Sequence, residues 1–203
     1  METHNSVPES FDENKSLQVI REMIEVSRKR IQKSGVLFIL WGWLMFYNYI
    51  SGYIVREIVL TYPVRKTIEY IGYALGMAVL AFTVYSIFKQ RRKVQTYIGI
   101  SLRWVWFALL VSLVIINLIQ YNVLHKINFE LQHPVFMVVI AFAIVVTGGI
   151  LRYRLIIAGG IVFGILAYGC SYLQLQQQIL VEAIAWVIAF VIPGHILFAK
   201  RKQ

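Results

Sequence analysis

The chain has 203 residues, of which 59% are hydrophobic and only 15% are charged. Roughly a quarter of residues are charged in soluble globular domains, so this composition excludes an ordinary soluble domain and indicates a membrane protein. In a soluble protein the net charge of +10 would suggest nucleic-acid binding. Here the basic residues lie beside apolar runs, where topology and anionic lipid headgroups explain them. We expect the lipid bilayer as a partner and no nucleic acid.

Residues 1–34 form the only sizeable polar segment. Apolar residues from Leu17 to Ile31 recur mostly at helical spacing and charged residues fill the other faces, which predicts an amphipathic helix. This helix could lie on the inner membrane surface. Alternatively, residues 15–34 could dock a cytoplasmic protein partner or a second copy of the chain in a homo-oligomer.

Six apolar runs follow, each about long enough to cross a bilayer as a helix. The sequence therefore predicts an all-α, polytopic membrane protein with six transmembrane helices in three hairpins, preceded by the cytoplasmic amphipathic helix. The transmembrane domain covers residues 35–199, and a basic tail occupies residues 200–203. The expected spans are about 35–54, 68–88, 102–121, 134–151, 155–172 and 179–199.

The orientation follows from the stretch 147–160, where Arg152 and Arg154 separate two long uncharged runs. Lys and Arg favour cytoplasmic loops, so this turn is expected to be cytoplasmic. Alternation through six spans then places both termini in the cytoplasm. In this topology all but four of the 20 Lys and Arg residues lie in cytoplasmic segments. The exceptions are Arg56, Arg65, Lys66 and Lys126.

Small residues that lie four positions apart predict close contacts between helices. Gly72 and Gly76 form one such pair, and Gly160 and Gly164 form another. This spacing places the small residues on one helix face, where two backbones can approach. The contacts could form within this one bundle or between copies of the chain.

Polar residues at membrane depth are the candidates for a cavity or ligand site, because buried amides and carboxylates are costly there. They are expected in the outer half of the bundle or at its outer edge, where a carboxylate could determine a ligand or proton site. Alternatively, they belong to an interfacial aromatic belt, with the carboxylates reaching water. The candidates are Asn48, Glu69, Asn117, Gln120 and Glu182.

Pro193 and Gly194 interrupt the last apolar run and are followed by His195. Proline removes one helix hydrogen bond and glycine loosens the turn, so we expect a kink. The kink could be static or serve as a gating hinge.

The sequence does not favour an enzyme. Its four histidines are scattered, and no metal-ligand or nucleophile motif occurs. The spacing of His125, Glu130 and His133 matches no metal template. Cys170 is the only cysteine, so no intramolecular disulfide and no CxxC site can form. We expect no catalytic residue, cofactor or metal.

Three phrases carry a resemblance to a known group of proteins: GVLFILWGWL from residue 35, RYRLIIAGGIVFGILAY from residue 152 and IPGHILFAKRK from residue 192. In layout and in these phrases, most of residues 20–202 resemble an uncharacterised family of small bacterial six-span integral membrane proteins. The resemblance implies a multi-pass protein of the bacterial cytoplasmic (inner) membrane. It transfers no functional residue.

Two functions fit these patterns. The first is a non-enzymatic sensor or regulatory membrane component whose amphipathic helix engages a cytoplasmic protein. The alternative is a small transporter or channel subunit with an outward-facing polar cavity. Transport predicts that Glu69, Asn117 and Glu182 converge on one water-filled path, whereas a regulatory component predicts a dry bundle.

Overall fold

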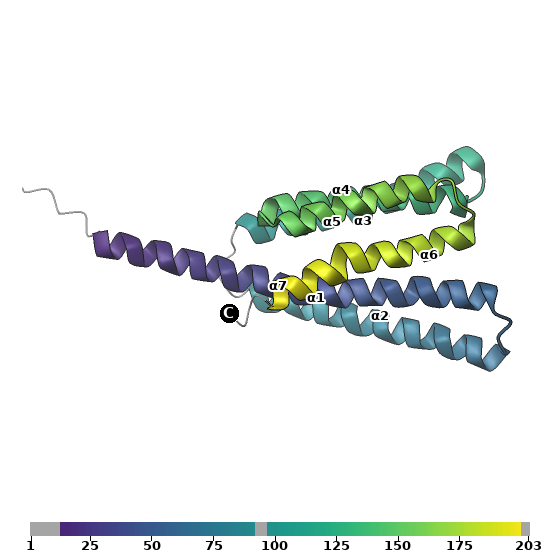
Figure 1. Cartoon of the computed structure of the whole chain (residues 1–203), viewed down its shortest axis with the longest axis horizontal. Coiled ribbons are helices and arrows are strands. Elements are labelled where there is room, and N and C mark those ends of the chain that lie inside the picture. The colour runs from purple at the N-terminus through teal and green to yellow at the C-terminus, as the bar shows by residue number, and fades with distance from the viewer. Residues whose placement is uncertain (1–12, 92–96, 200–203) are drawn as a thin grey trace, which may run out of the picture.

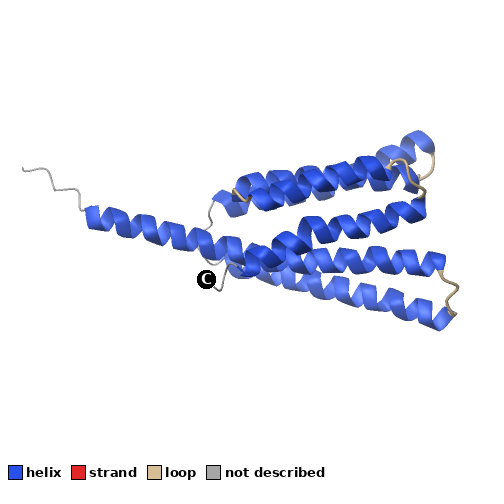
Figure 2. Ribbon diagram, viewed as in Figure 1, coloured by secondary structure: helices blue, strands red, loops and turns tan. Residues whose placement is uncertain are grey.

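The computed structural model describes the backbone of residues 13–91 and 97–199, and this part of the chain is helical without any strand (Figure 2). The side chains of residues 15–34 and the whole tail 200–203 lie outside what the structure describes. The helices are α1 (Glu13–Glu57), α2 (Tyr62–Arg91), α3 (Tyr97–Leu124), α4 (Phe129–Leu151), α5 (Arg154–Cys170), α6 (Leu175–Trp186), the π-helical turn η1 (Val187–Val191) and α7 (Ile192–Ala199).

Five helical segments are long and apolar enough to cross a membrane. This confirms the prediction of an all-helical chain and is compatible with a membrane-embedded protein. The segments are Gly35–Glu57 in α1, Tyr62–Ser86 in α2, Gly99–Leu124 in α3, Phe129–Leu151 in α4, and Leu175–Ala199, which joins α6, η1 and α7.

The fifth apolar run forms a helix shorter than the five long apolar segments. Predicted over residues 155–172, it is helical only from Arg154 to Cys170, a length of 17 residues. At 1.5 Å per residue this is about 26 Å, somewhat short of a bilayer core of roughly 30 Å. The helix ends early because residues 171–174 turn the chain toward α6.

The helices form two groups with the last helical rod between them (Figure 1). In one group α3 packs against α4 and α4 against α5, while in the other α2 packs against α1. The rod α6–η1–α7 contacts α1 on one side and α5 on the other, and α6 also reaches α4. The last rod therefore connects the two groups.

The α4–α5 pair turns within two residues. Arg152 takes a left-handed backbone conformation with φ of 52°, and its N–H caps the end of α4. Two glycines allow close approach: a Cβ on Gly148 would lie 2.7 Å from Ile157 N, and one on Gly160 would lie 2.9 Å from Val145 N. The short turn and these backbone contacts hold α4 and α5 side by side.

A second close contact joins α1 to the last rod. A Cβ on Gly42 would lie 2.9 Å from Phe190 Cβ, and a Cβ on Gly194 would lie 3.1 Å from Ile39 N. Beside this contact the Phe38 and Phe190 rings stack at 5.1 Å between centroids. Aromatic and aliphatic side chains thus fill the interior toward the α7 end of the rod.

Helices α2 and α3 expose most of their apolar side chains. In the most apolar 18-residue stretch of either helix, only 6% of the residues are buried. The corresponding share is 50% in α4 and 56% in the α6–α7 rod. Such continuous apolar exposure is unfavourable in water and is expected where lipid tails cover a helix. The buried part of the molecule is therefore built around α4, α5 and the last rod.

Candidate functional site

The buried face of α6 carries polar side chains. Gln178, Glu182 and Trp186 follow one another at intervals of four residues, which places them on one side of the helix. Their exposed fractions are 1%, 0% and 5%. A carboxylate buried to this degree needs partners, because its desolvation is costly.

Partners for Glu182 come from α1 and α4. His133 Nδ1 lies 2.6 Å from Glu182 Oε2, so one proton is shared across this contact whichever group carries it. The Tyr49 ring meets the His133 ring edge-on at 6.1 Å between centroids, and the Tyr49 side chain interacts with Glu182 and Trp186. We call Tyr49, His133, Glu182 and Trp186 the Glu182 cluster. It joins α1, α4 and α6.

The cluster leaves some polar atoms unsatisfied. Among the described residues, Glu182 Oε1 and Trp186 Nε1 have no hydrogen-bond partner, and neither does Gln178 Oε1 one turn away. Gln178 uses its amide group to donate to the Leu173 carbonyl at 2.9 Å. Each unsatisfied buried group costs about 1–3 kcal/mol. The cluster can therefore accept a further donor at Glu182.

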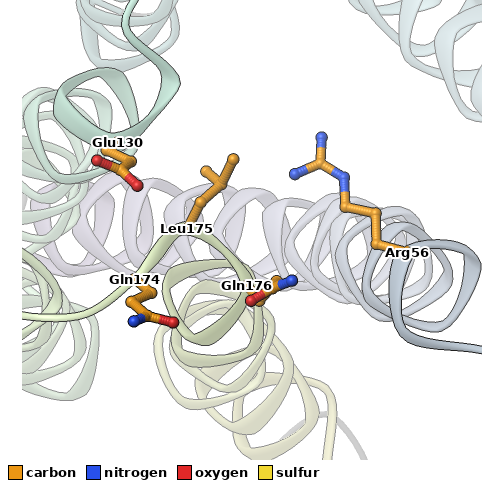
Figure 3. Close-up of a pocket in the computed structure, with 5 residues that line it drawn as sticks. All are labelled: Arg56, Glu130, Gln174, Leu175 and Gln176. Carbon is orange, nitrogen blue, oxygen red and sulfur yellow. The ribbon is translucent and has the colours of Figure 1, made fainter.

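A pocket opens on the same three helices at the end of the molecule where α6 begins (Figure 3). Its volume is about 470 Å³, and it is lined by Arg56, Glu130, Gln174, Leu175 and Gln176. We call it the end pocket. Figure 3 places the Arg56 guanidinium and the Glu130 carboxylate on different sides of the hollow, with Leu175 between them.

The end pocket lies beyond the Glu182 cluster along each helix. Arg56 follows Tyr49 by two turns of α1, Glu130 precedes His133 by one turn of α4, and Leu175 precedes Glu182 by two turns of α6. Residues separated by three, four or seven positions share a helix face. The pocket and the cluster therefore occupy the same faces, roughly 5–10 Å apart along the helices.

Two of the predicted cavity residues lie elsewhere, in an open groove between α1 and α2. Asn48 and Glu69 line this groove of about 240 Å³. Glu69 pairs with Arg65 at 3.3 Å and with Lys66 at 2.9 Å. Asn48 donates to the Leu44 carbonyl within its own helix.

Asn117 and Gln120 belong to a third place, on α3. Asn117 Oδ1 accepts a hydrogen bond from Gln132 Nε2 of α4 at 3.0 Å, and Asn117 Nδ2 donates to the Leu113 carbonyl. Gln120 is 6% exposed and its Oε1 has no partner. Glu69, Asn117 and Glu182 thus have separate partners: Glu69 pairs within α2, Asn117 with Gln132 of α4, and Glu182 with His133 of α4.

The candidate hinge residues Pro193 and Gly194 follow directly after a stretch of irregular backbone. The irregular backbone is the π-helical turn Val187–Val191, which precedes Pro193. Proline has no N–H to donate to the residue 189 carbonyl, and a wider turn accommodates that loss. Gly194 itself is tightly packed against Ile39 of α1, so it serves as a contact residue in this structure.

Of the four predicted packing glycines, Gly160 makes the closest contact. Gly72 approaches Asn48 of α1 at 3.3 Å, measured from a Cβ built on the glycine, and Gly164 approaches Ala141 at 3.5 Å. Within the part of the chain that the structure describes, nothing lies within 4 Å of a Cβ built on Gly76, so this glycine makes no such contact there. The tight contacts of Gly42 and Gly194 were not predicted as packing, because their partners lie on distant helices.

Sequence reasoning also missed several members of the site: Arg56, Gln174, Gln176 and Gln178 were not predicted. The signal that could have found part of it is the four-residue spacing of Gln178, Glu182 and Trp186. His133 was considered only with His125 and Glu130 as a metal site. Within the described residues, no group of three or more His, Cys, Asp or Glu could hold a metal ion.

No known protein family, curated protein or solved structure matches this chain. The site is therefore interpreted from its own geometry.

Proposed function

We propose that this protein is a non-enzymatic sensor or regulatory component of the bacterial cytoplasmic membrane, with six spans and both termini in the cytoplasm. In this proposal the Glu182 cluster is the element whose state changes. Helix α1 carries that state to a cytoplasmic partner bound by residues 15–34. The distribution of Lys and Arg supports the orientation.

One observation carries the proposal: α1 is a single helix from Glu13 to Glu57. Its apolar part, Gly35–Glu57, contains Tyr49 of the cluster. The remaining turns project beyond the bundle (Figure 1). A continuous helix moves as one rigid body, so a displacement at Tyr49 would also displace the part of α1 that projects beyond the bundle.

The connections around Glu182 supply a physical means of switching. The carboxylate contacts α4 through His133 and α1 through Tyr49, and these helices belong to the two groups joined by α6. A change in the charge or occupancy of Glu182 alters both contacts at once. The expected result is a change in the position of α1 relative to α4 and α5.

The alternative function, a transporter or channel subunit, rested on one outward-facing cavity shared by Glu69, Asn117 and Glu182. These residues have separate partners: Arg65 and Lys66, Gln132, and His133, respectively. The regulatory proposal needs no such path and accounts for the buried Glu182 contacts. We therefore favour it.

The proposal is tested by measuring how α1 sits relative to the α4–α5 pair. Spin labels at Ser27→Cys on α1 and Gly149→Cys on α4, in a Cys170→Ala background, would report the distance between these helices in lipid nanodiscs. Gly149 has nothing within 4 Å of an added Cβ, so a label is tolerated there. We expect Glu182→Gln to shift the distance distribution.

Glu69→Gln is the matched control, because Glu69 is a carboxylate in the α1–α2 groove that is not part of the cluster. This control should leave the distribution unchanged. Identical distributions for the unsubstituted chain and Glu182→Gln would refute the coupling of the cluster to α1.

A further inference from the structure

The end pocket brings opposite charges together without pairing them. Arg56 comes from the last turn of α1 and Glu130 from the first turn of α4. Among the residues that the structure describes, neither has an ion-pair partner. By contrast, Arg65 at the same end of the molecule is paired with Glu69.

The remaining lining suits a small polar ligand. Gln174 and Gln176 contribute amides that both donate and accept hydrogen bonds, and Leu175 adds an apolar contact (Figure 3). A volume of about 470 Å³ lies toward the small end of the range for ligand pockets. A ligand with one charge would leave the opposite charge of the pocket uncompensated.

We infer that the end pocket binds a small zwitterion, a molecule that carries an ammonium group and an anionic group, such as a free α-amino acid. Its carboxylate is held by Arg56, whose planar guanidinium matches a carboxylate with two parallel hydrogen bonds. Its ammonium is held by Glu130, and Leu175 contacts its side chain. A phosphoethanolamine lipid headgroup presents the same pair of charges.

The inferred ligand also suits the position of the pocket. It would connect the ends of α1, α4 and α6, the three helices that the Glu182 cluster joins. Binding that draws Arg56 and Glu130 toward one ligand would bias the same helix arrangement. In this respect the inference rests on the proposed function, since the zwitterion would be the signal that is sensed.

The test is a binding titration of the full chain in phosphatidylglycerol nanodiscs, whose headgroups carry no ammonium group. Glycine, leucine and phosphoethanolamine are the zwitterions, and acetate and methylammonium are the single-charge analogues. We expect a zwitterion to bind and to raise the unfolding temperature. Binding by the analogues should be at least about tenfold weaker.

The variants identify the site. Arg56→Gln and Glu130→Gln should each weaken zwitterion binding by about ten- to hundredfold, as expected when a charged hydrogen-bond partner is lost. Arg65→Gln and Glu57→Gln remove the same charges from neighbouring residues that do not line the pocket, and they should leave binding unchanged. All four positions are exposed, so each variant is expected to fold.

A second arm separates a free ligand from a lipid. In nanodiscs containing phosphatidylethanolamine, occupation by the headgroup would raise the unfolding temperature without added zwitterion and weaken binding of the free one. Either source supports the inference if Arg56→Gln and Glu130→Gln abolish the effect. Absence of any effect from free or lipid zwitterions overturns it. Equal binding by acetate or methylammonium, or binding insensitive to both variants, overturns it as well.

The two proposals fail separately. If zwitterions bind but neither Glu182→Gln nor the ligand changes the α1 distance, the ligand inference is supported and the sensor function is refuted. If Glu182→Gln moves α1 but no zwitterion binds, the sensor function is supported and the ligand inference is refuted.

Discussion

Glu182 is the residue at which three helices meet. Because its carboxylate is buried, neighbouring groups must compensate its desolvation. One carboxylate oxygen is 2.6 Å from His133 and the other has no partner. Buried carboxylates are retained when neighbouring groups compensate their desolvation. His133 does so here because α4 and α6 pack with this pair at their contact.

At this scale we predict that His133→Ala destabilises the protein more than His133→Ala combined with Glu182→Gln. The single substitution leaves a buried carboxylate without its partner, whereas the double substitution also removes the charge. Breaking a fully buried pair costs about 3–5 kcal/mol of unfolding free energy. Because the His133 side chain is 19% exposed, we expect His133→Ala to cost about 2–3 kcal/mol.

Unfolding free energies measured by denaturant titration in mixed micelles would check this difference. Glu69→Ala serves as a control, since its ion pairs are solvent-exposed and contribute little. An unchanged free energy for His133→Ala would mean that the contact with Glu182 does not stabilise the fold.

Among whole elements, α4 and α5 form the closest pair. Two residues separate them, and Gly148 and Gly160 bring their backbones together. The sequence predicted the turn from two charged residues between uncharged runs, and it predicted Gly160 from its spacing to Gly164. It could not distinguish Gly160 from Gly76, because identical spacing says nothing about whether a neighbour is present.

We predict that Gly160→Ala destabilises the protein and Gly76→Ala does not. A Cβ at Gly160 would lie 2.7 Å from Val145 Cγ2 and 2.9 Å from Val145 N, so the helices must separate, at a cost of about 1–3 kcal/mol. A Cβ at Gly76 meets open space, and the better helix propensity of alanine favours the folded state.

Thermal unfolding of both variants in the same detergent would measure the contrast. Equal effects would show that the α4–α5 contact is looser than described. A loss only in Gly76→Ala would instead indicate that this glycine contacts a second copy of the chain.

For the whole molecule, alternation of the connections gives the bundle two distinct ends (Figure 1). The α1–α2, α3–α4 and α5–α6 connections lie at one end, and the α4–α5 turn and the end of α7 lie at the other, from which α1 projects. Arg152 and Arg154 are therefore at the same end as the α1 extension. This agrees with the bias in Lys and Arg from which the orientation was predicted.

We predict that reporter fusions find the α3–α4 connection outside and the C-terminus in the cytoplasm. Alkaline phosphatase fused after Lys126 should be active, and a fluorescent protein fused after Gln203 should fluoresce. Fusion after Val59, in the α1–α2 connection, should behave like the fusion after Lys126. If α5, with only 17 residues, did not cross the membrane, Lys126 and Gln203 would lie on the same side.

The sequence by itself determined the helical class, the approximate positions of the helices and the candidate status of Glu182, because apolar runs and polar residues within them are local properties. The tertiary structure alone decided that Glu182 meets His133 and Tyr49, that Asn117 pairs with Gln132, and that Arg56 faces Glu130 across a pocket. Such contacts depend on which helix faces pack together. Side-chain spacing within one helix cannot specify its neighbour on another.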